Sequence, residues 1–106
     1  MPIDPQRVKL ILTYDIIGET QDRYYQYMLG EVVPAVQSLG LYMSGAWHTA
    51  YGEYPVRLVE FIADDQTALN EVLDSPAWER MEVRLQEFVV NYSKKIVRLR
   101  DDQFQF

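Results

Sequence analysis

The stretch RVKLILTYDI, from Arg7 to Ile16, alternates between two kinds of side chain. One set is large and apolar or aromatic, and consists of Val8, Leu10, Leu12 and Tyr14. The intervening set is mixed, and consists of Lys9, Ile11, Thr13 and Asp15. A period of two is that of a β-strand, whose successive side chains point to opposite faces. The stretch therefore predicts a strand with one core-facing surface and a second surface that is only partly polar.

The segment after this strand predicts a helix that ends before Gly40. Thr20 is a favourable N-cap residue, and a glycine just past the last turn is a common C-terminal signal. The helical stripe consists of Tyr24, Met28, Val32, Ala35 and Leu39. Pro34 lacks an N–H and crowds the carbonyl of Gly30, so we expect a kink between these two residues that wraps the helix around a twisted sheet.

The rest of the chain predicts two strands, a split helix and a last strand. Residues 41–51 and 55–63 flank Gly52 and Glu53, which suit a tight hairpin. Residues 64–75 suggest a short helix, and Ser75 with Pro76 begins a second one. Its apolar stripe consists of Trp78, Met81, Leu85, Phe88 and Tyr92. Residues 93–100 alternate again, giving the order β-α-β-β-α-β of an α+β, ferredoxin-like fold with a four-stranded antiparallel sheet.

Composition limits the class of protein. A length of 106 residues predicts one domain, spanning residues 1–106. The formal charge is −6, which argues against binding to nucleic acid or to an anionic membrane surface. The chain has no cysteine, so disulfides and thiolate chemistry are excluded. The first residues hold no long apolar run, and we expect a cytoplasmic protein.

The second face of the sheet predicts a homodimer. Helices on one side leave the other side bare, and Ile11 makes that side too apolar to stay in water. Two such sheets packed across a two-fold axis would form a dimeric α/β barrel. The tail DDQFQF, residues 101–106, ends in Phe104 and Phe106, and we expect it to dock on the partner subunit. Docking on its own subunit is the alternative.

Four motifs resemble one superfamily across nearly the whole chain. They are LTYDI, VVPAVQSLGLY, AWHTAYG and SPAWERMEVRLQEF. The layout is similar to the dimeric α/β-barrel superfamily, which includes NIPSNAP-type, stress-responsive barrel and antibiotic-biosynthesis monooxygenase-like domains. The resemblance implies the fold more than the chemistry. Some members oxygenate substrates without a cofactor in a pocket between sheet and helices, others bind haem, and others have no known activity.

Side chains alternate across each strand, so the pairing of the predicted hairpin places the only histidine on one face of the sheet. His48 shares a face with Arg57 and with the small residues Ser44, Ala46 and Ala50, which best allow helices to approach. We therefore expect this face to point toward the helices and His48 to have a structural role. A catalytic base or a haem ligand is the alternative, and one histidine without cysteine makes a poor transition-metal site. We expect no metal or cofactor. The expected barrel interior consists of Thr13, Asp15, Trp47, Thr49, Tyr51, Glu60 and Arg98.

Glu60 is the most unusual residue of the chain because it interrupts the apolar strand RLVEFIA. A carboxylate there has to be paired, hydrogen-bonded or neutral. A salt bridge, to Arg98 or across the dimer, is the expected arrangement. An unpaired Glu60 would instead be a candidate general acid or base, together with His48 and Asp15.

Two classes of function follow. The first is a homodimeric module that binds a small apolar or aromatic molecule, or acts as an accessory protein, without catalysis. The second is a cofactor-independent monooxygenase or isomerase that acts on a small aromatic or polyketide-like compound. Trp47, Tyr51 and Trp78 would line an aromatic pocket in either case, although core packing is the commoner fate of such residues.

Overall fold

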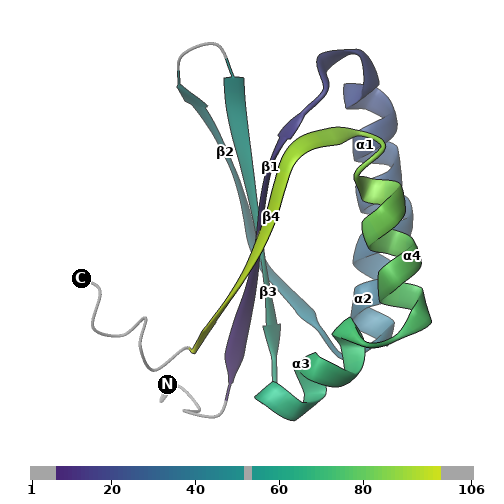
Figure 1. Cartoon of the computed structure of the whole chain (residues 1–106), viewed down its shortest axis with the longest axis vertical. Coiled ribbons are helices and arrows are strands. Elements are labelled where there is room, and N and C mark those ends of the chain that lie inside the picture. The colour runs from purple at the N-terminus through teal and green to yellow at the C-terminus, as the bar shows by residue number, and fades with distance from the viewer. Residues whose placement is uncertain (1–6, 52–53, 99–106) are drawn as a thin grey trace.

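Strand β1 (Val8–Ile16) is a central strand of a four-stranded sheet with the order β2-β3-β1-β4. It pairs antiparallel with β3 (Tyr54–Ala63) on one side and with β4 (Val89–Arg98) on the other. Strand β2 (Tyr42–Tyr51) forms one edge. The structure is a computed structural model that describes residues 7–51 and 54–98, and residues 48–51 and 54–56 by their backbone alone. The predicted ferredoxin-like α+β fold is confirmed (Figure 1).

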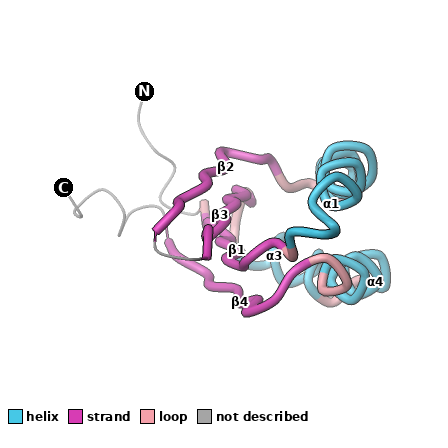
Figure 2. The backbone as a smooth tube through the Cα atoms, turned by 90° about the horizontal axis from the view of Figure 1, so that it is seen from above, coloured by secondary structure: helices cyan, strands magenta, loops and turns pink. Residues whose placement is uncertain are grey.

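The helices cover one face of the sheet. The first crossover runs through a 3-10 turn (Gly18–Thr20), α1 (Gln21–Tyr27), a π-helical segment (Met28–Val32) and α2 (Val33–Ser38). The second runs through α3 (Gln66–Leu73) and α4 (Pro76–Leu85). Figure 2 shows α1 and α4 side by side on one side of the strands, and no described helix on the other side. One sheet face is therefore a core and the other is open.

The core confirms the alternation predicted for the first strand. Val8, Leu10, Leu12 and Tyr14 are all buried, whereas the residues between them are half-buried. The other large side chains with no exposed surface belong to the helices, to β3 and to the loop before β2: Tyr24, Val36, Leu41, Val59, Phe61 and Leu69. Burial of this apolar surface is the main force that holds the helices on the sheet.

The first helix departs from regular geometry where the sequence predicts a kink. The ladder widens to a π-helical turn over Met28–Val32. Helix α2 follows directly, begins at Val33 and has Pro34 in its first turn. This arrangement accommodates a proline without an N–H inside one continuous helical crossover. Gly40 has a φ of 100° and Leu41 N–H donates to Val36 O at 2.9 Å, so the helix ends at glycine as predicted.

Two predicted helix starts differ in outcome. Ser75 caps α4 as predicted, because its Oγ accepts a hydrogen bond from Trp78 N–H at 3.2 Å. The prediction for Thr20 is wrong, since its hydroxyl donates to the carbonyls of Ile17 and Phe88 instead of capping α1. A 3-10 turn precedes α1 and supplies the first carbonyls itself.

The prediction that the last helix extends to Tyr92 is also wrong. Helix α4 ends at Leu85, a turn follows in which Phe88 N–H donates to Leu85 O, and β4 begins at Val89. The β-branched pair Val89 and Val90 favours the strand. Tyr92 therefore belongs to β4, where it is half-buried, and its ring stacks 6.3 Å from that of Tyr14.

The core contains one polar contact between two buried phenols. The hydroxyls of Tyr14 on β1 and Tyr24 on α1 are hydrogen-bonded to each other, and their rings meet edge to face with centroids 5.7 Å apart. Both residues are at most 1% exposed. Burial raises the pKa of each phenol, so both stay neutral at physiological pH. The pair ties the first helix to the central strand.

Removing one of these hydroxyls leaves the other buried in the core without its hydrogen-bond partner. Tyr14→Phe is expected to lower the free energy of unfolding by about 1–3 kcal/mol, measured by urea denaturation. The double variant Tyr14→Phe with Tyr24→Phe is expected to cost less than the sum of the two single variants, because no orphaned hydroxyl remains. Strictly additive losses would show that the two hydroxyls are not coupled.

Candidate functional site

Glu60 lies at the centre of the open sheet face. Its strand position pairs with Ile11 of β1 on one side and Gly45 of β2 on the other. Its Oε2 lies 3.6 Å from Lys9 Nζ and accepts a hydrogen bond from Ser44 Oγ at 3.3 Å. The side chains of Lys9 and Glu60 are 17% and 16% exposed. Glu60 is thus ion-paired, as expected, but its partner is Lys9 and not Arg98.

A bulge in β2 brings Ser44 to this ion pair. The register between β2 and β3 shifts between Met43 and Gly45, so Ser44 is the extra residue. The alternation of this strand predicts that Ser44 faces the helices, together with Ala46 and Ala50. That assignment is wrong, because its hydroxyl donates to Glu60 on the open face. The other hairpin pairings agree with the predicted parity, with Trp47 opposite Leu58 and His48 opposite Arg57.

Two polar pairs join β1 to β4 on the same face. The hydroxyls of Thr13 and Ser93 are hydrogen-bonded at 2.6 Å. Asn91 Nδ2 donates to Asp15 Oδ2 at 2.9 Å, from a backbone with φ of 57° at the point where the register shifts. Asp15 Oδ1 is buried and finds no donor among the described residues. Asp15 therefore keeps one acceptor atom available.

Aromatic and aliphatic groups surround these polar pairs. Trp47 is 50% exposed, Tyr42 is 59% exposed and Val90 is 47% exposed. A Cβ atom on Gly45 would collide with the indole ring of Trp47, so the ring lies against this glycine. Absence of a side chain at residue 45 is what lets the indole lie close to the sheet. The open face consequently combines polar groups that are paired with each other and exposed apolar surface.

Two residues predicted for the pocket lie elsewhere. Arg98 pairs with Val8, whose side chain belongs to the helix-facing core, so Arg98 is on the other side of the sheet, where it is exposed. Trp78 belongs to α4, is only 3% exposed and packs into the core. Thr49 and Tyr51 are paired through their backbone with Val56 and Tyr54. Phe104 and Phe106 lie outside the described residues.

A third polar cluster lies between β4 and α4. Glu82 Oε2 accepts hydrogen bonds from Tyr92 Oη at 2.7 Å and from Lys94 Nζ at 2.8 Å. Burial tends to raise the pKa of Glu82, but the hydrogen bonds from Lys94 and Tyr92 outweigh it and hold this pKa below its usual range. Burial, together with the bond to Glu82, raises the pKa of Tyr92. The cluster fastens the end of α4 to the edge strand.

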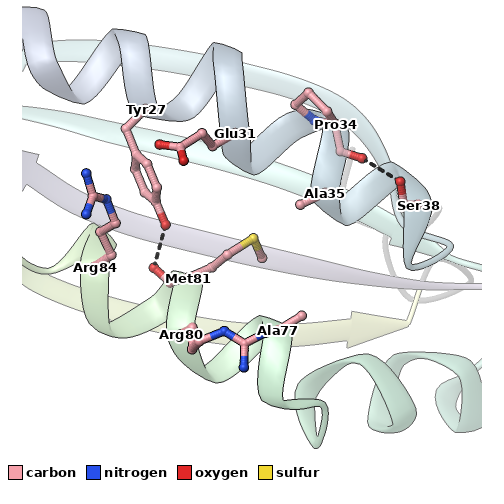
Figure 3. Close-up of a pocket in the computed structure, with 9 residues that line it drawn as sticks. All are labelled: Tyr27, Glu31, Pro34, Ala35, Ser38, Ala77, Arg80, Met81 and Arg84. Carbon is pink, nitrogen blue, oxygen red and sulfur yellow. Dashed lines mark hydrogen bonds between the residues drawn. The ribbon is translucent and has the colours of Figure 1, made fainter.

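A groove that the sequence pattern does not predict separates the first helical crossover from α4. Its volume is about 560 Å³, and Figure 3 shows its lining side chains. One wall comes from the α1 to α2 crossover, with Tyr27, Glu31, Pro34, Ala35 and Ser38. The other comes from α4, with Ala77, Arg80, Met81 and Arg84. Tyr27 Oη bridges the walls by donating to Met81 O at 3.1 Å.

Neither a cluster of metal ligands nor a membrane-spanning helix is found in the part of the chain that the structure describes. Across residues 7–51 and 54–98, no group of three histidine, aspartate or glutamate side chains converges as metal ligands would. Within the same ranges, no helix is both long and apolar enough to cross a membrane.

Comparison with solved structures gives the same architecture. A NIPSNAP-like domain protein from Burkholderia xenovorans is 19% identical, with a TM-score of 0.63 over 89% of this chain and 85% of that one. A NIPSNAP family protein from Agrobacterium tumefaciens is 16% identical, with a TM-score of 0.64 over 92% and 90%. A candidate antibiotic biosynthesis monooxygenase from Deinococcus radiodurans is 13% identical, with a TM-score of 0.66 over 86% and 90%.

These neighbours share the fold of this chain. The chain has the ferredoxin-like architecture of NIPSNAP-type and monooxygenase-like domains, the group that its sequence motifs resemble. At these identities the likeness establishes the fold and not the chemistry. No family model matches the sequence, and no curated protein matches it.

Loss of the Glu60 charge tests whether the ion pair is structural. Glu60→Gln is expected to lower the free energy of unfolding by about 1 kcal/mol, because Lys9 loses a half-buried partner. Urea denaturation measures the change, and Glu71→Gln, on the exposed side of α3, is the control that should stay within about 0.5 kcal/mol of the parent. Unchanged stability with altered ligand binding would instead mean that Glu60 serves a pocket.

Proposed function

We propose that the protein is a homodimeric binding module whose two open sheet faces pack against each other across a two-fold axis. The observation that carries this proposal is the combination of large exposed side chains, above all Trp47 and Tyr42, with an internally paired Glu60. Apolar groups that are exposed together on one face mark an interaction surface more often than a free surface. A second copy of the same sheet fits this face because an isologous interface is self-complementary.

The polar pairs on the open face are compatible with burial in such an interface. Glu60 is neutralised by Lys9, and the hydroxyls of Thr13 and Ser93 satisfy one another. A charge or a hydroxyl that already has its partner costs little further when a second sheet covers it. The module would hold a small apolar or aromatic molecule between the sheets, against the indole of Trp47.

One observation favours the enzymatic alternative. Asp15 Oδ1 is buried on the open face without a described donor, so it is able to accept a proton or a hydrogen bond from a bound molecule. A cofactor-independent monooxygenase or isomerase would use such a carboxylate. Native mass spectrometry of the purified protein is the first test of the dimer and of its binding site. It reports the number of subunits and the mass of any small molecule that stays bound.

A charge on the open face should break the proposed dimer. Trp47→Lys is expected to raise the dimer dissociation constant by about a hundredfold or more, measured by sedimentation equilibrium, because an ammonium group would be buried without a partner. Val83→Lys is the matched control, since Val83 is 63% exposed on α4, away from the sheet, and should leave the dimer intact.

A second variant perturbs the same place without a charge. Gly45→Ala pushes the indole of Trp47 from its position against the sheet, and a weaker dimer is expected. If Trp47→Lys and the parent dimerise equally well, or if the parent is a monomer, the proposed assembly is wrong.

The tail from Asp101 to Phe106 is proposed to dock on the partner subunit. Ending the chain after Arg100 should raise the dimer dissociation constant by about tenfold, since two phenylalanines would leave the interface. The full-length variant Phe104→Ser with Phe106→Ser should reproduce the effect, which separates the aromatic groups from the acidic ones. A truncated chain that dimerises as tightly as the parent would contradict the docking.

A further inference from the structure

The groove between the helices has an unusual distribution of charge. The chain as a whole carries a formal charge of −6, yet the groove is lined by two guanidinium groups and one carboxylate. Arg80 and Arg84 come from one face of α4, one turn apart, and Glu31 comes from the opposite helix. The lining of the groove therefore has one more cationic than anionic group, while Glu79 and Glu87 lie beside the same two arginines on the adjoining surface.

The charged groups of the groove do not neutralise each other. Neither arginine makes an ion pair with a carboxylate of the described residues, and Glu31 makes none there either. The Arg84 guanidinium instead lies 5.3 Å from the centroid of the Tyr27 ring. Arg80 has no hydrogen-bond or ion-pair partner in the described part of the chain. Its guanidinium N–H donors are available to a ligand.

The remaining polar groups of the groove are already satisfied. The Ser38 hydroxyl donates to Pro34 O at 3.1 Å, and the Tyr27 hydroxyl donates to Met81 O at 3.1 Å. Between them, the walls offer the methyl groups of Ala35 and Ala77 and the thioether of Met81 (Figure 3). Small side chains on facing walls leave the space open, and thioethers adapt to different apolar shapes. The surface between the charged groups is thus apolar.

The π-helical segment that accommodates Pro34 also forms part of the groove wall. Glu31 lies within the turn Met28–Val32, where the helical ladder widens. Such segments cost stability and occur frequently at functional sites. Wrapping the helix around the sheet explains a bend, but it does not explain why a charged side chain of this segment lines a groove.

We propose that the groove binds a small amphipathic carboxylate, with its head group on Arg80 and its short apolar chain against Ala35, Ala77 and Met81. A guanidinium fork suits a carboxylate, which it can contact through two parallel hydrogen bonds. The α4 wall from Ala77 to Arg84 spans about 10 Å, which fits a short chain and not a long one. The volume of about 560 Å³ is in the range of small-molecule sites. Glu31 limits the affinity and favours ligands with a single negative charge.

Octanoate and 1-octanol are the probes that test this site. Titration of the labelled full-length protein, followed by two-dimensional NMR of its amides, should shift residues 27–38 and 77–84 with octanoate. Octanol, which has the same chain without the charge, should bind less tightly. Arg80→Gln should weaken octanoate binding by about fivefold and leave octanol unchanged. Arg98→Gln removes the same charge from an exposed position on β4 and should change neither.

For two further variants, the direction of the change in binding affinity is expected from the charge and size of the new side chain. Glu31→Gln should tighten octanoate binding, because it removes the carboxylate that lines the groove opposite the two arginines. Ala35→Leu should abolish the binding of both probes by filling the groove, with no change of charge.

Equal affinities of octanoate and octanol, or an Arg80→Gln variant that binds octanoate like the parent, would overturn the proposal. Shifts confined to the open sheet face around Ile11 and Trp47 would also overturn it. The subunit number is measured in the same samples, so failure of the groove proposal and failure of the dimer are distinguished.

Discussion

Strand β1 is paired on both sides, and its alternation therefore assigns the side chains of its neighbours to one of two faces. Residues directly opposite each other in an antiparallel pair share a face, so Leu10 and Leu12 bring Phe61 and Val59 of β3 into the core. The same constraint sends Glu60 to the open face. A slip of one residue in this strand would bury Lys9 and expose Leu10, which makes the register the constraint on which the rest of the structure depends.

The helices cover only one of the two sheet faces that this alternation defines. They cover the core face, where the bond between Tyr14 and Tyr24 also anchors the first helix. The open face retains an internally paired carboxylate among exposed aromatic groups, which is a poor surface to leave in water and a suitable one to cover with a second sheet. The apolar surface that the single chain leaves exposed to water is the physical basis of the proposed dimer.

Departures from regular geometry coincide with the candidate sites. The bulge at Ser44 brings a hydroxyl to Glu60, the left-handed residue Asn91 brings an amide to Asp15, and the π-helical turn contains Glu31. Each irregularity places a polar side chain where an ideal strand or helix would not. Regular elements build the scaffold, and their interruptions position the groups that are available for chemistry or binding.

The sequence by itself determined the order of elements, the core face of the first strand, the parity of the hairpin, and the cap at Ser75, because these depend on neighbours within a few residues. Only the tertiary structure decided that Glu60 pairs with Lys9 while Arg98 lies across the sheet, that Trp78 is core, and that Tyr92 belongs to a strand. The groove likewise required the packing of two helices far apart in the chain. Periodicity fixes which way a side chain points, but its partner depends on strand order, register and bulges, which are set by contacts between distant segments.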